Sequence, residues 1–274
     1  MRSVPVRRWR RISSSTRSDV GLGIAFEGCA GRAAFHAGVV DGLHGAGLAP
    51  AYVAGASSGS IVAALVAAGL PHRLVDIWRS AVGQAVFRPR RILRGRWPFA
   101  MSQIVGDAVE AVFQTRRLES LALPIAIPVT LVGLRGKRRR ILTRDDDISV
   151  VEAVLASCFI PGPYSRMVAI DRCLAVDGAW DVRTPVEAVL RLGASRVIAV
   201  VANPELELQL GYPTRDRLRP PADCVVVGPA EPLPVGAWDT DAGRVGRAIE
   251  AGRMAAARFV SRPGAGPFEA CQSP

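Results

Sequence analysis

The stretch 52–61, Tyr-Val-Ala-Gly-Ala-Ser-Ser-Gly-Ser-Ile, constrains the fold of this chain more than any other. It has the pattern Gly-x-Ser-x-Gly, with Ser57 at its centre, between a short apolar run and a helical run. In a strand-to-helix turn of this kind the serine hydroxyl projects from a sharp bend, and Gly55 and Gly59 leave room for neighbouring backbone. The first amides of the helix also favour negative charge near Ser57. The motif therefore predicts a nucleophilic serine, with a plain Ser/Gly helix cap as the alternative.

The residues before this turn indicate the class of fold. The apolar run 20–26 predicts a buried strand, and the small-residue turn after it leads into a helical pattern at 33–44. A second short strand is expected at 51–54, and an almost wholly apolar helix, which implies deep burial, at 60–70. The order strand, glycine turn, helix, strand, serine turn, helix predicts an α/β fold with parallel central strands.

The rest of the chain continues the alternation without an internal repeat. The apolar run 124–134 and its return at 140–143 predict a hairpin. Asp145, Asp146 and Asp147 look exposed and are interpreted as caps of the next helix. Further helices are expected at 74–86, 104–118, 148–158, 184–192 and 239–260, and further strands at 167–170, 174–176, 197–201 and 224–227. The predicted organisation is a basic disordered arm at 1–19, a core at 20–202, and a C-terminal extension at 203–274 that packs on the core and includes the last helix.

A serine nucleophile needs a base, and the histidines of this chain do not suit that task. They are His36, His44 and His72, so none follows the motif at the late position that a Ser–acid–His order requires. A carboxylate can take the proton instead. Asp177 is the best candidate, because it ends an apolar strand and Gly178 leaves room beside it, although an Asp-Gly pair is also a common turn.

The turn after the first predicted strand supplies candidate donors for a developing oxyanion. Backbone amides of Gly28, Cys29, Ala30 and Gly31 can point into a pocket shared with Ser57. A nucleotide phosphate is the alternative ligand, but Ala30 stands where the dinucleotide pattern requires its second glycine. A P-loop is excluded, because no Gly-Lys-Ser/Thr ends the turn.

The formal net charge of +11 calls for an anionic partner or for many solvated arginines. Arginines cluster at 7–11, 88–96 and 135–140, without a nucleic-acid-binding signature, so no nucleic acid is expected. Aromatic and aliphatic residues interleave the loop 88–99, which favours peripheral contact with an anionic membrane. No apolar run is long enough for a membrane span. Five scattered cysteines predict no disulfide framework and no metal site, and favour a cytoplasmic location.

The chain contains a set of short motifs in a fixed order: Gly28-Cys29-Ala30-Gly31-Arg32, Phe35-His36-Ala37-Gly38-Val39, Gly55-Ala56-Ser57-Ser58-Gly59, Ala153-x-x-Ala156-Ser157-x-x-Ile160-Pro161, Asp177-Gly178-Ala179 and Thr184-Pro185-Val186. Taken together, these motifs resemble the patatin-like phospholipase family over about 20–202. The resemblance implies a three-layer α/β/α sandwich with a mostly parallel sheet and a Ser–Asp dyad that needs no cofactor. Ser57 would be the nucleophile, Asp177 the base, amides of Gly28 to Arg32 the oxyanion donors, and fatty-acyl esters of lipids the substrates.

The expectation is thus a serine acyl hydrolase acting on membrane-derived lipid esters. The glycine loop departs from the family pattern at Glu27, Cys29, Ala30 and Ala33. This departure gives an alternative, a catalytically weak or inactive scaffold that binds lipid or a protein partner. The sequence specifies no oligomeric state.

Overall fold

The computed structural model describes residues 21–134, 136–203 and 224–261. The basic N-terminal segment 1–19, predicted to be disordered, and almost all of the irregular segment expected at 203–222 lie outside these residues. Within them, eight strands form one sheet in the order β5-β6-β3-β2-β1-β7-β8, with β4 also paired to β3. The strands are β1 (Leu22–Phe26), β2 (Tyr52–Gly55), β3 (Ile125–Gly133), β4 (Gly136–Leu142), β5 (Val168–Ile170), β6 (Cys173–Val176), β7 (Arg196–Val200) and β8 (Cys224–Val227).

The sheet has a parallel part and an antiparallel part that meet in β3. Strands β8, β7, β1, β2 and the start of β3 are parallel neighbours. The rest of β3 pairs antiparallel with β4 on one side and β6 on the other, and β5 pairs antiparallel with β6. The parallel strands all point their carboxyl ends the same way, so the turns after β1 and β2 lie at one edge of the sheet.

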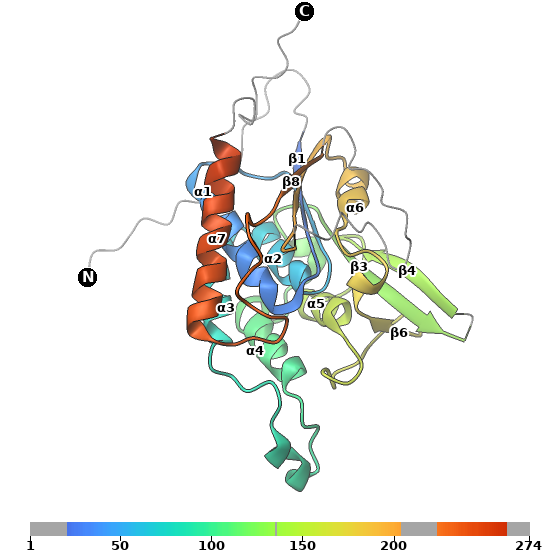
Figure 1. The fold of residues 1–274 in the computed structure, drawn as a ribbon. Helices are drawn as coiled ribbons and strands as arrows, with labels where there is room; N and C mark the ends of the chain where they lie inside the picture. The colour runs from blue at the N-terminus through green and yellow to red at the C-terminus, as the bar shows by residue number, and fades with distance from the viewer. Residues whose placement is uncertain (1–20, 135, 204–223, 262–274) are drawn as a thin grey trace, which may run out of the picture.

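Helices cover both faces of this sheet, which confirms the predicted α/β fold with a mostly parallel centre (Figure 1). Alternate residues of β1 show the two faces: Ile24 and Phe26 join the large core against α1, α2 and α5, and Ala25 joins a smaller core against α6. The helices are α1 (Ala34–Gly45), α2 (Ser58–Ala67), α3 (Leu74–Ser80), α4 (Met101–Phe113), α5 (Val150–Cys158), α6 (Val186–Arg191) and α7 (Ala242–Val260). No helix among the described residues is long and apolar enough to cross a membrane.

Helix α2 carries the serine motif at its start and is buried along its whole length. This burial confirms the expectation from its apolar sequence. The buried helix packs against β1 and β2, and this packing holds the serine motif at the edge of the sheet.

Helix α7 packs directly along α1 at the outer side of the molecule (Figure 1). Glycines make this approach possible. A Cβ atom on Gly38 would lie 1.9 Å from the carbonyl oxygen of Ile249, and one on Gly252 would lie 2.1 Å from that of Phe35. The predicted terminal helix is therefore part of the helical layer.

Several predicted boundaries were wrong for local reasons. Helix α3 ends at Ser80 instead of 86, shortly before Gly83 with φ +74°. Helix α4 spans Met101–Phe113 instead of 104–118, because Gln114 turns to φ +49°. The return strand of the hairpin is longer than expected, since β4 begins at Gly136.

The aspartates that were expected to cap α5, Asp145, Asp146 and Asp147, do not cap it. Ser149 caps this helix in a capping box with Glu152. Asp146 accepts from the amide of Thr143 and pairs with Arg140, and Asp147 pairs with Arg117.

Candidate active site

Ser57 sits at the turn between β2 and α2 in a strained conformation, with φ +49° and ψ −128°. The flanking glycines allow the turn to close. A Cβ atom on Gly55 would lie 2.1 Å from the carbonyl oxygen of Gly59, and one on Gly59 would lie 2.5 Å from that of Phe26. The bend therefore presses the backbone of the turn against itself and against β1, and leaves the Ser57 side chain as the group that projects.

Asp177 follows β6 and meets Ser57 directly, 120 residues apart in the chain. The Ser57 hydroxyl donates to Oδ2 of Asp177 at 2.7 Å, and the amide of Ala179 donates to Oδ1 at 2.7 Å. Asp177 is 2% exposed, and its burial raises the pKa of the carboxyl group from 3.8 to about 6, against the hydrogen bonds from Ser57 and Ala179. A carboxylate with this pKa is charged at neutral pH and is more basic than an exposed one.

The backbone around Asp177 is as tightly packed as that around Ser57. A Cβ atom on Gly178 would lie 1.9 Å from the carbonyl oxygen of Pro128 in β3. The hydroxyl of Thr130, two residues further along β3, donates to the carbonyl oxygen of Asp177 at 3.1 Å. Strand β3 thus fixes the position of the turn that carries Asp177.

Ser157, near the end of α5, links the two halves of this site. Its hydroxyl accepts a hydrogen bond from the amide of Ser57 at 2.9 Å and donates one to the carbonyl oxygen of Pro128 at 2.8 Å. Ser157 belongs to the motif Ala153-x-x-Ala156-Ser157-x-x-Ile160-Pro161, from which no role for its hydroxyl was predicted. Its polar side chain in a helix that is apolar and buried apart from Glu152 in the first turn was the available signal.

The glycine turn lies beside Ser57, but most of its amides have acceptors within the protein. Gly28 donates to the carbonyl oxygen of Arg183, Gly31 to that of Ala237 and Arg32 to that of Cys29. The amide of Cys29 donates to the hydroxyl of Ser58 at 3.2 Å. Of the five predicted oxyanion donors, Ala30 is the one whose amide has no acceptor among the described residues. It has φ +53° and lines the pocket next to Ser57.

Three buried residues under this turn, Glu27, Cys29 and His36, bring their potential ligand atoms within 4.8 Å of one another. The carboxylate of Glu27 already accepts from the Arg183 guanidinium at 2.6 Å and from the amide of Ala202 at 2.6 Å. Burial raises the pKa of the Cys29 thiol and lowers that of His36 to about 3, so both side chains are neutral. A cation at this position would have to displace Arg183, so we interpret the group as the support of the turn.

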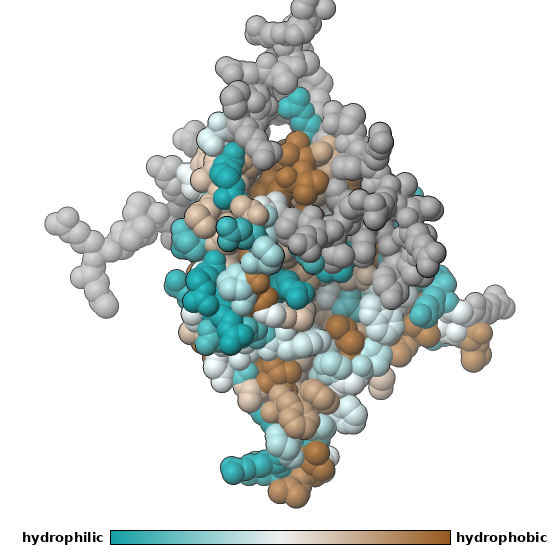
Figure 2. Space-filling view, in the orientation of Figure 1, coloured by the Kyte–Doolittle hydropathy of each residue, from teal (hydrophilic) through white to brown (hydrophobic). Residues whose placement is uncertain are grey.

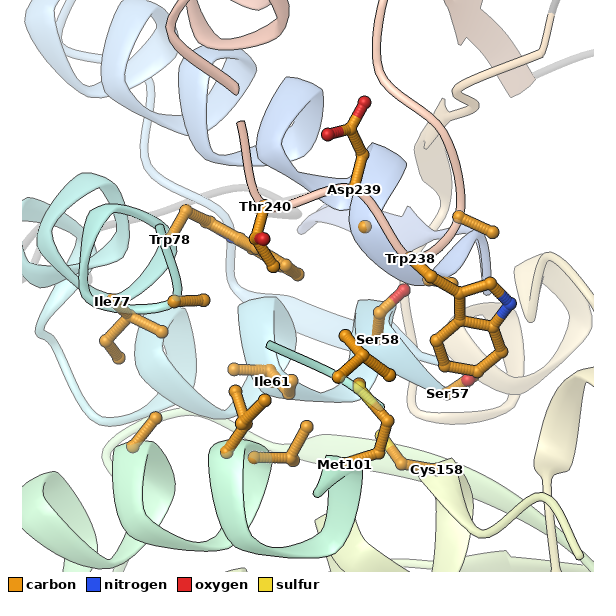
Figure 3. Close-up of a pocket in the computed structure, with 18 of the residues that line it drawn as sticks. Ser57, Ser58, Ile61, Ile77, Trp78, Met101, Cys158, Trp238, Asp239 and Thr240 are labelled. Atoms are coloured by element: carbon orange, nitrogen blue, oxygen red, sulfur yellow. The ribbon is translucent and has the colours of Figure 1, made fainter. Parts of the chain in front are cut away.

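A mostly apolar pocket opens beside Ser57 (Figure 3). Trp238, Met101 and Cys158 line this pocket together with Ser57 and Ser58 (Figure 3). The walls come from α2, α3, α4, α5 and the segment 237–245, and include Ile61, Ile77, Trp78, Ile104, Tyr164 and Val245. Trp238 could not be assigned to the site from the sequence, because a lone tryptophan between two irregular segments carries no pattern that relates it to Ser57.

The three histidines and the aspartates at 145–147, which were the other candidates for a base, do not line the pocket beside Ser57. His36 is fully buried behind the glycine turn, and His72 is exposed in a short 3-10 turn. His44 is near the end of α1. Asp145 is exposed in the loop after β4. Among the candidates for a base, the structure brings Asp177 alone to the hydroxyl of Ser57.

Comparison with known proteins gives one family match. A family model described as patatin-like phospholipase matches residues 24–190, a range that includes the serine turn and Asp177. VipD from Legionella pneumophila is similar in structure, with 12% identity, 88% of this chain and 67% of VipD covered, and a TM-score of 0.54. This likeness supports the fold.

Two further solved structures match at lower scores. ExoU in complex with SpcU from Pseudomonas aeruginosa has 13% identity, with 89% of this chain and 53% of that chain covered and a TM-score of 0.42. Human GIVD cytosolic phospholipase A2 has 17% identity, with 48% and 23% covered and a TM-score of 0.33. The chain thus spans about half or less of the length of these two proteins.

Proposed function

The chain belongs to the patatin-like phospholipase family, and from this premise we propose that it is a serine acyl hydrolase that cleaves fatty-acyl esters of lipids through Ser57 and Asp177. The observation that carries the proposal is the 2.7 Å hydrogen bond from the Ser57 hydroxyl to the buried carboxylate of Asp177, beside an apolar pocket. A nucleophile held by its base at hydrogen-bond distance is the arrangement that acyl transfer requires.

In the first half of the reaction, Oγ of Ser57 attacks the ester carbonyl while Asp177 takes the hydroxyl proton. The negative charge that develops on the carbonyl oxygen is stabilised by the amide of Ala30 and by the N-terminus of α2. The bond from the carbonyl carbon to the alcohol oxygen then breaks, and the leaving alcohol receives the proton from Asp177. The product of this half is an acyl ester on Ser57.

In the second half, Asp177 takes a proton from water, and the resulting hydroxide attacks the acyl ester. Collapse of the intermediate breaks the bond to Oγ, returns the proton to Ser57 and releases the fatty acid. The apolar pocket accommodates the acyl chain during both halves, because its walls from α2, α4 and α5 offer almost no polar groups.

A second candidate function is a scaffold that binds lipid without efficient turnover. The observation that favours it is the engagement of the loop amides, in particular the hydrogen bond from Gly31 to the carbonyl oxygen of Ala237 at 2.8 Å. A loop with one free amide stabilises an oxyanion less than a loop with several, and loss of one donor costs about 100-fold or more in rate.

Hydrolysis of a short-chain nitrophenyl ester, together with labelling by a fluorophosphonate, tests the proposal. We expect Ser57→Ala to abolish both signals and Asp177→Asn to reduce hydrolysis by about 1,000-fold or more. Asp145→Asn is the matched control, because it removes an exposed carboxylate away from the pocket. Parent-like hydrolysis by Ser57→Ala or Asp177→Asn contradicts the dyad, and a parent protein that neither labels nor hydrolyses supports the scaffold.

A further inference from the structure

Residues 87–99, here called the arm, leave the body of the molecule between α3 and α4 and extend away from it (Figure 1). The arm has a defined stem. Phe87 and Phe99 form an antiparallel bridge with ring centroids 5.1 Å apart, and the amide of Arg88 donates to the carbonyl oxygen of Pro98 at 2.8 Å. At the far end, Pro89–Arg94 forms a 3-10 helix that ends at Gly95 with φ +63°.

The arm exposes large apolar side chains to water, and two of them, Ile92 and Leu93, lie in the 3-10 helix at its far end. Leu93 is 88% exposed, Ile92 is 58% exposed and Trp97 is 49% exposed. Figure 2 shows hydrophobic and hydrophilic residues side by side at this end of the molecule. Apolar residues gathered at the end of a projecting segment mark a contact surface, since scattered single residues are the usual pattern on a protein surface.

The arginines of the arm carry positive charge that no carboxylate of the described residues neutralises. Among the described residues, the side chains of Arg88 and Arg91 donate to neutral groups: the carbonyl oxygen of Ala85, Gln84 and Gln103. None of the arginines from 88 to 96 forms an ion pair within the described part of the chain. The arginines of β4 differ, because Arg138, Arg139 and Arg140 pair with Asp171, Asp181 and Asp146.

The base of the arm is part of the pocket wall. Val86 and Met101, which flank the arm in sequence, both line the pocket, and the amide of Ala100 donates to the carbonyl oxygen of Val86 at 2.8 Å. The indole of Trp97 donates to the carbonyl oxygen of Gly162, in the loop that follows α5. A partner surface that binds the arm would therefore lie close to the pocket that opens beside Ser57.

We propose that the arm docks the protein on an anionic membrane, with Ile92 and Leu93 entering the boundary between headgroups and acyl chains and the arginines contacting lipid phosphates. An anionic membrane suits both kinds of side chain at the far end of the arm. The apolar part of the bilayer accommodates Ile92 and Leu93, and the anionic surface attracts the arginines. A nucleic acid would engage the cations and leave the aliphatic side chains in water. The proposal concerns binding, and it does not depend on hydrolysis by Ser57.

Sedimentation with vesicles tests the docking, using the full chain with Ser57→Ala so that no lipid is consumed. The vesicles consist of phosphatidylcholine with or without phosphatidylglycerol. We expect binding to need phosphatidylglycerol, Leu93→Asp to weaken it about tenfold or more, and Arg90→Gln with Arg94→Gln to weaken it by a similar factor.

The chain offers a matched control for each change. Leu134→Asp alters a fully exposed leucine in the turn just after β3, and Arg247→Gln with Arg258→Gln removes two exposed charges from α7. We expect these controls to bind as the parent does, and residues 1–19 are the same in every variant. The proposal is overturned if the arm variants bind vesicles as well as the controls do. It is also overturned if the arm variants lose binding to a single-stranded RNA but keep their binding to vesicles.

Discussion

At the scale of single residues, the environment of Asp177 predicts how the proposed activity depends on pH. The carboxyl group must be ionised to accept the Ser57 proton, and burial raises its pKa to about 6. We expect kcat/KM for a neutral ester to be low at pH 5, to rise through pH 6 and to level off above pH 7. A pH–rate profile measures this, and a profile that is flat between pH 5 and 8 contradicts Asp177 as the base.

The same raised pKa has a consequence for stability. Between pH 3.8 and about 6 the folded protein binds a proton at Asp177 that the unfolded chain has released, so this group lowers the free energy of unfolding as the pH rises through that window. Above pH 6 the cost is about 3 kcal/mol, from the difference between the two pKa values. We therefore expect Asp177→Asn to raise Tm at pH 7 and to lose this advantage at pH 4. A lower Tm than the parent at pH 7 contradicts the prediction.

Ser157 is predicted to position the nucleophile through the hydrogen bond from its hydroxyl to the Ser57 amide. In Ser157→Ala this amide and the carbonyl of Pro128 lose their partner, and the strained turn relaxes. We expect kcat to fall about tenfold or more, with KM little changed and Ser57 labelling by fluorophosphonate slowed to a similar degree. Ser157→Thr keeps the hydroxyl and should recover most of kcat. A fall in Tm with unchanged kcat and labelling would mean that Ser157 only stabilises the fold.

At the scale of helices and strands, the sequence could predict what depends on local pattern. The apolar run of β1, the serine turn and the fully buried α2 can each be predicted from a single stretch of about ten residues or fewer. The ends of α3 and α4 depend on positive φ angles at Gly83 and Gln114, which no periodicity encodes. The place of Trp238 beside Ser57 depends on contacts across more than 180 residues of chain, so only the folded structure reveals it.

The contact between α1 and α7 gives a prediction at this scale. Gly252 faces α1, and a Cβ atom there would lie 2.1 Å from the carbonyl oxygen of Phe35, which the rigid helix backbone cannot accommodate. We expect Gly252→Ala to lower the free energy of unfolding in urea by about 3 kcal/mol, because the two helices must move apart. Gly246→Ala on the same helix meets nothing within 4 Å and should be neutral or slightly stabilising. Equal stability of the two variants contradicts the close packing.

At the scale of the whole molecule, the C-terminal part takes part in the site. Ala237 accepts from the glycine turn, Trp238 and Val245 line the pocket, and α7 covers α1. The family match ends at residue 190, before all of these residues. We propose that the division into a core at 20–202 and an extension at 203–274 describes the sequence motifs, and that both parts form one functional unit. In this proposed unit, residues from both parts line the pocket, and the arm at 87–99 lies beside it.

This arrangement predicts that the arm matters for lipid in a membrane and not for a soluble ester. Leu93 and Arg94 are exposed and do not line the pocket, so their replacement leaves the chemistry at Ser57 intact and removes the docking that brings it to the bilayer. We expect Leu93→Asp with Arg94→Gln to lower the rate of fatty-acid release from phosphatidylglycerol vesicles about tenfold, and to change hydrolysis of a nitrophenyl ester by less than about twofold. Leu134→Asp should change neither rate. A parallel fall with both substrates would instead place the effect in the pocket wall at Val86 and Met101, and parent-like rates with both would show that turnover at the vesicle needs no docking through the arm.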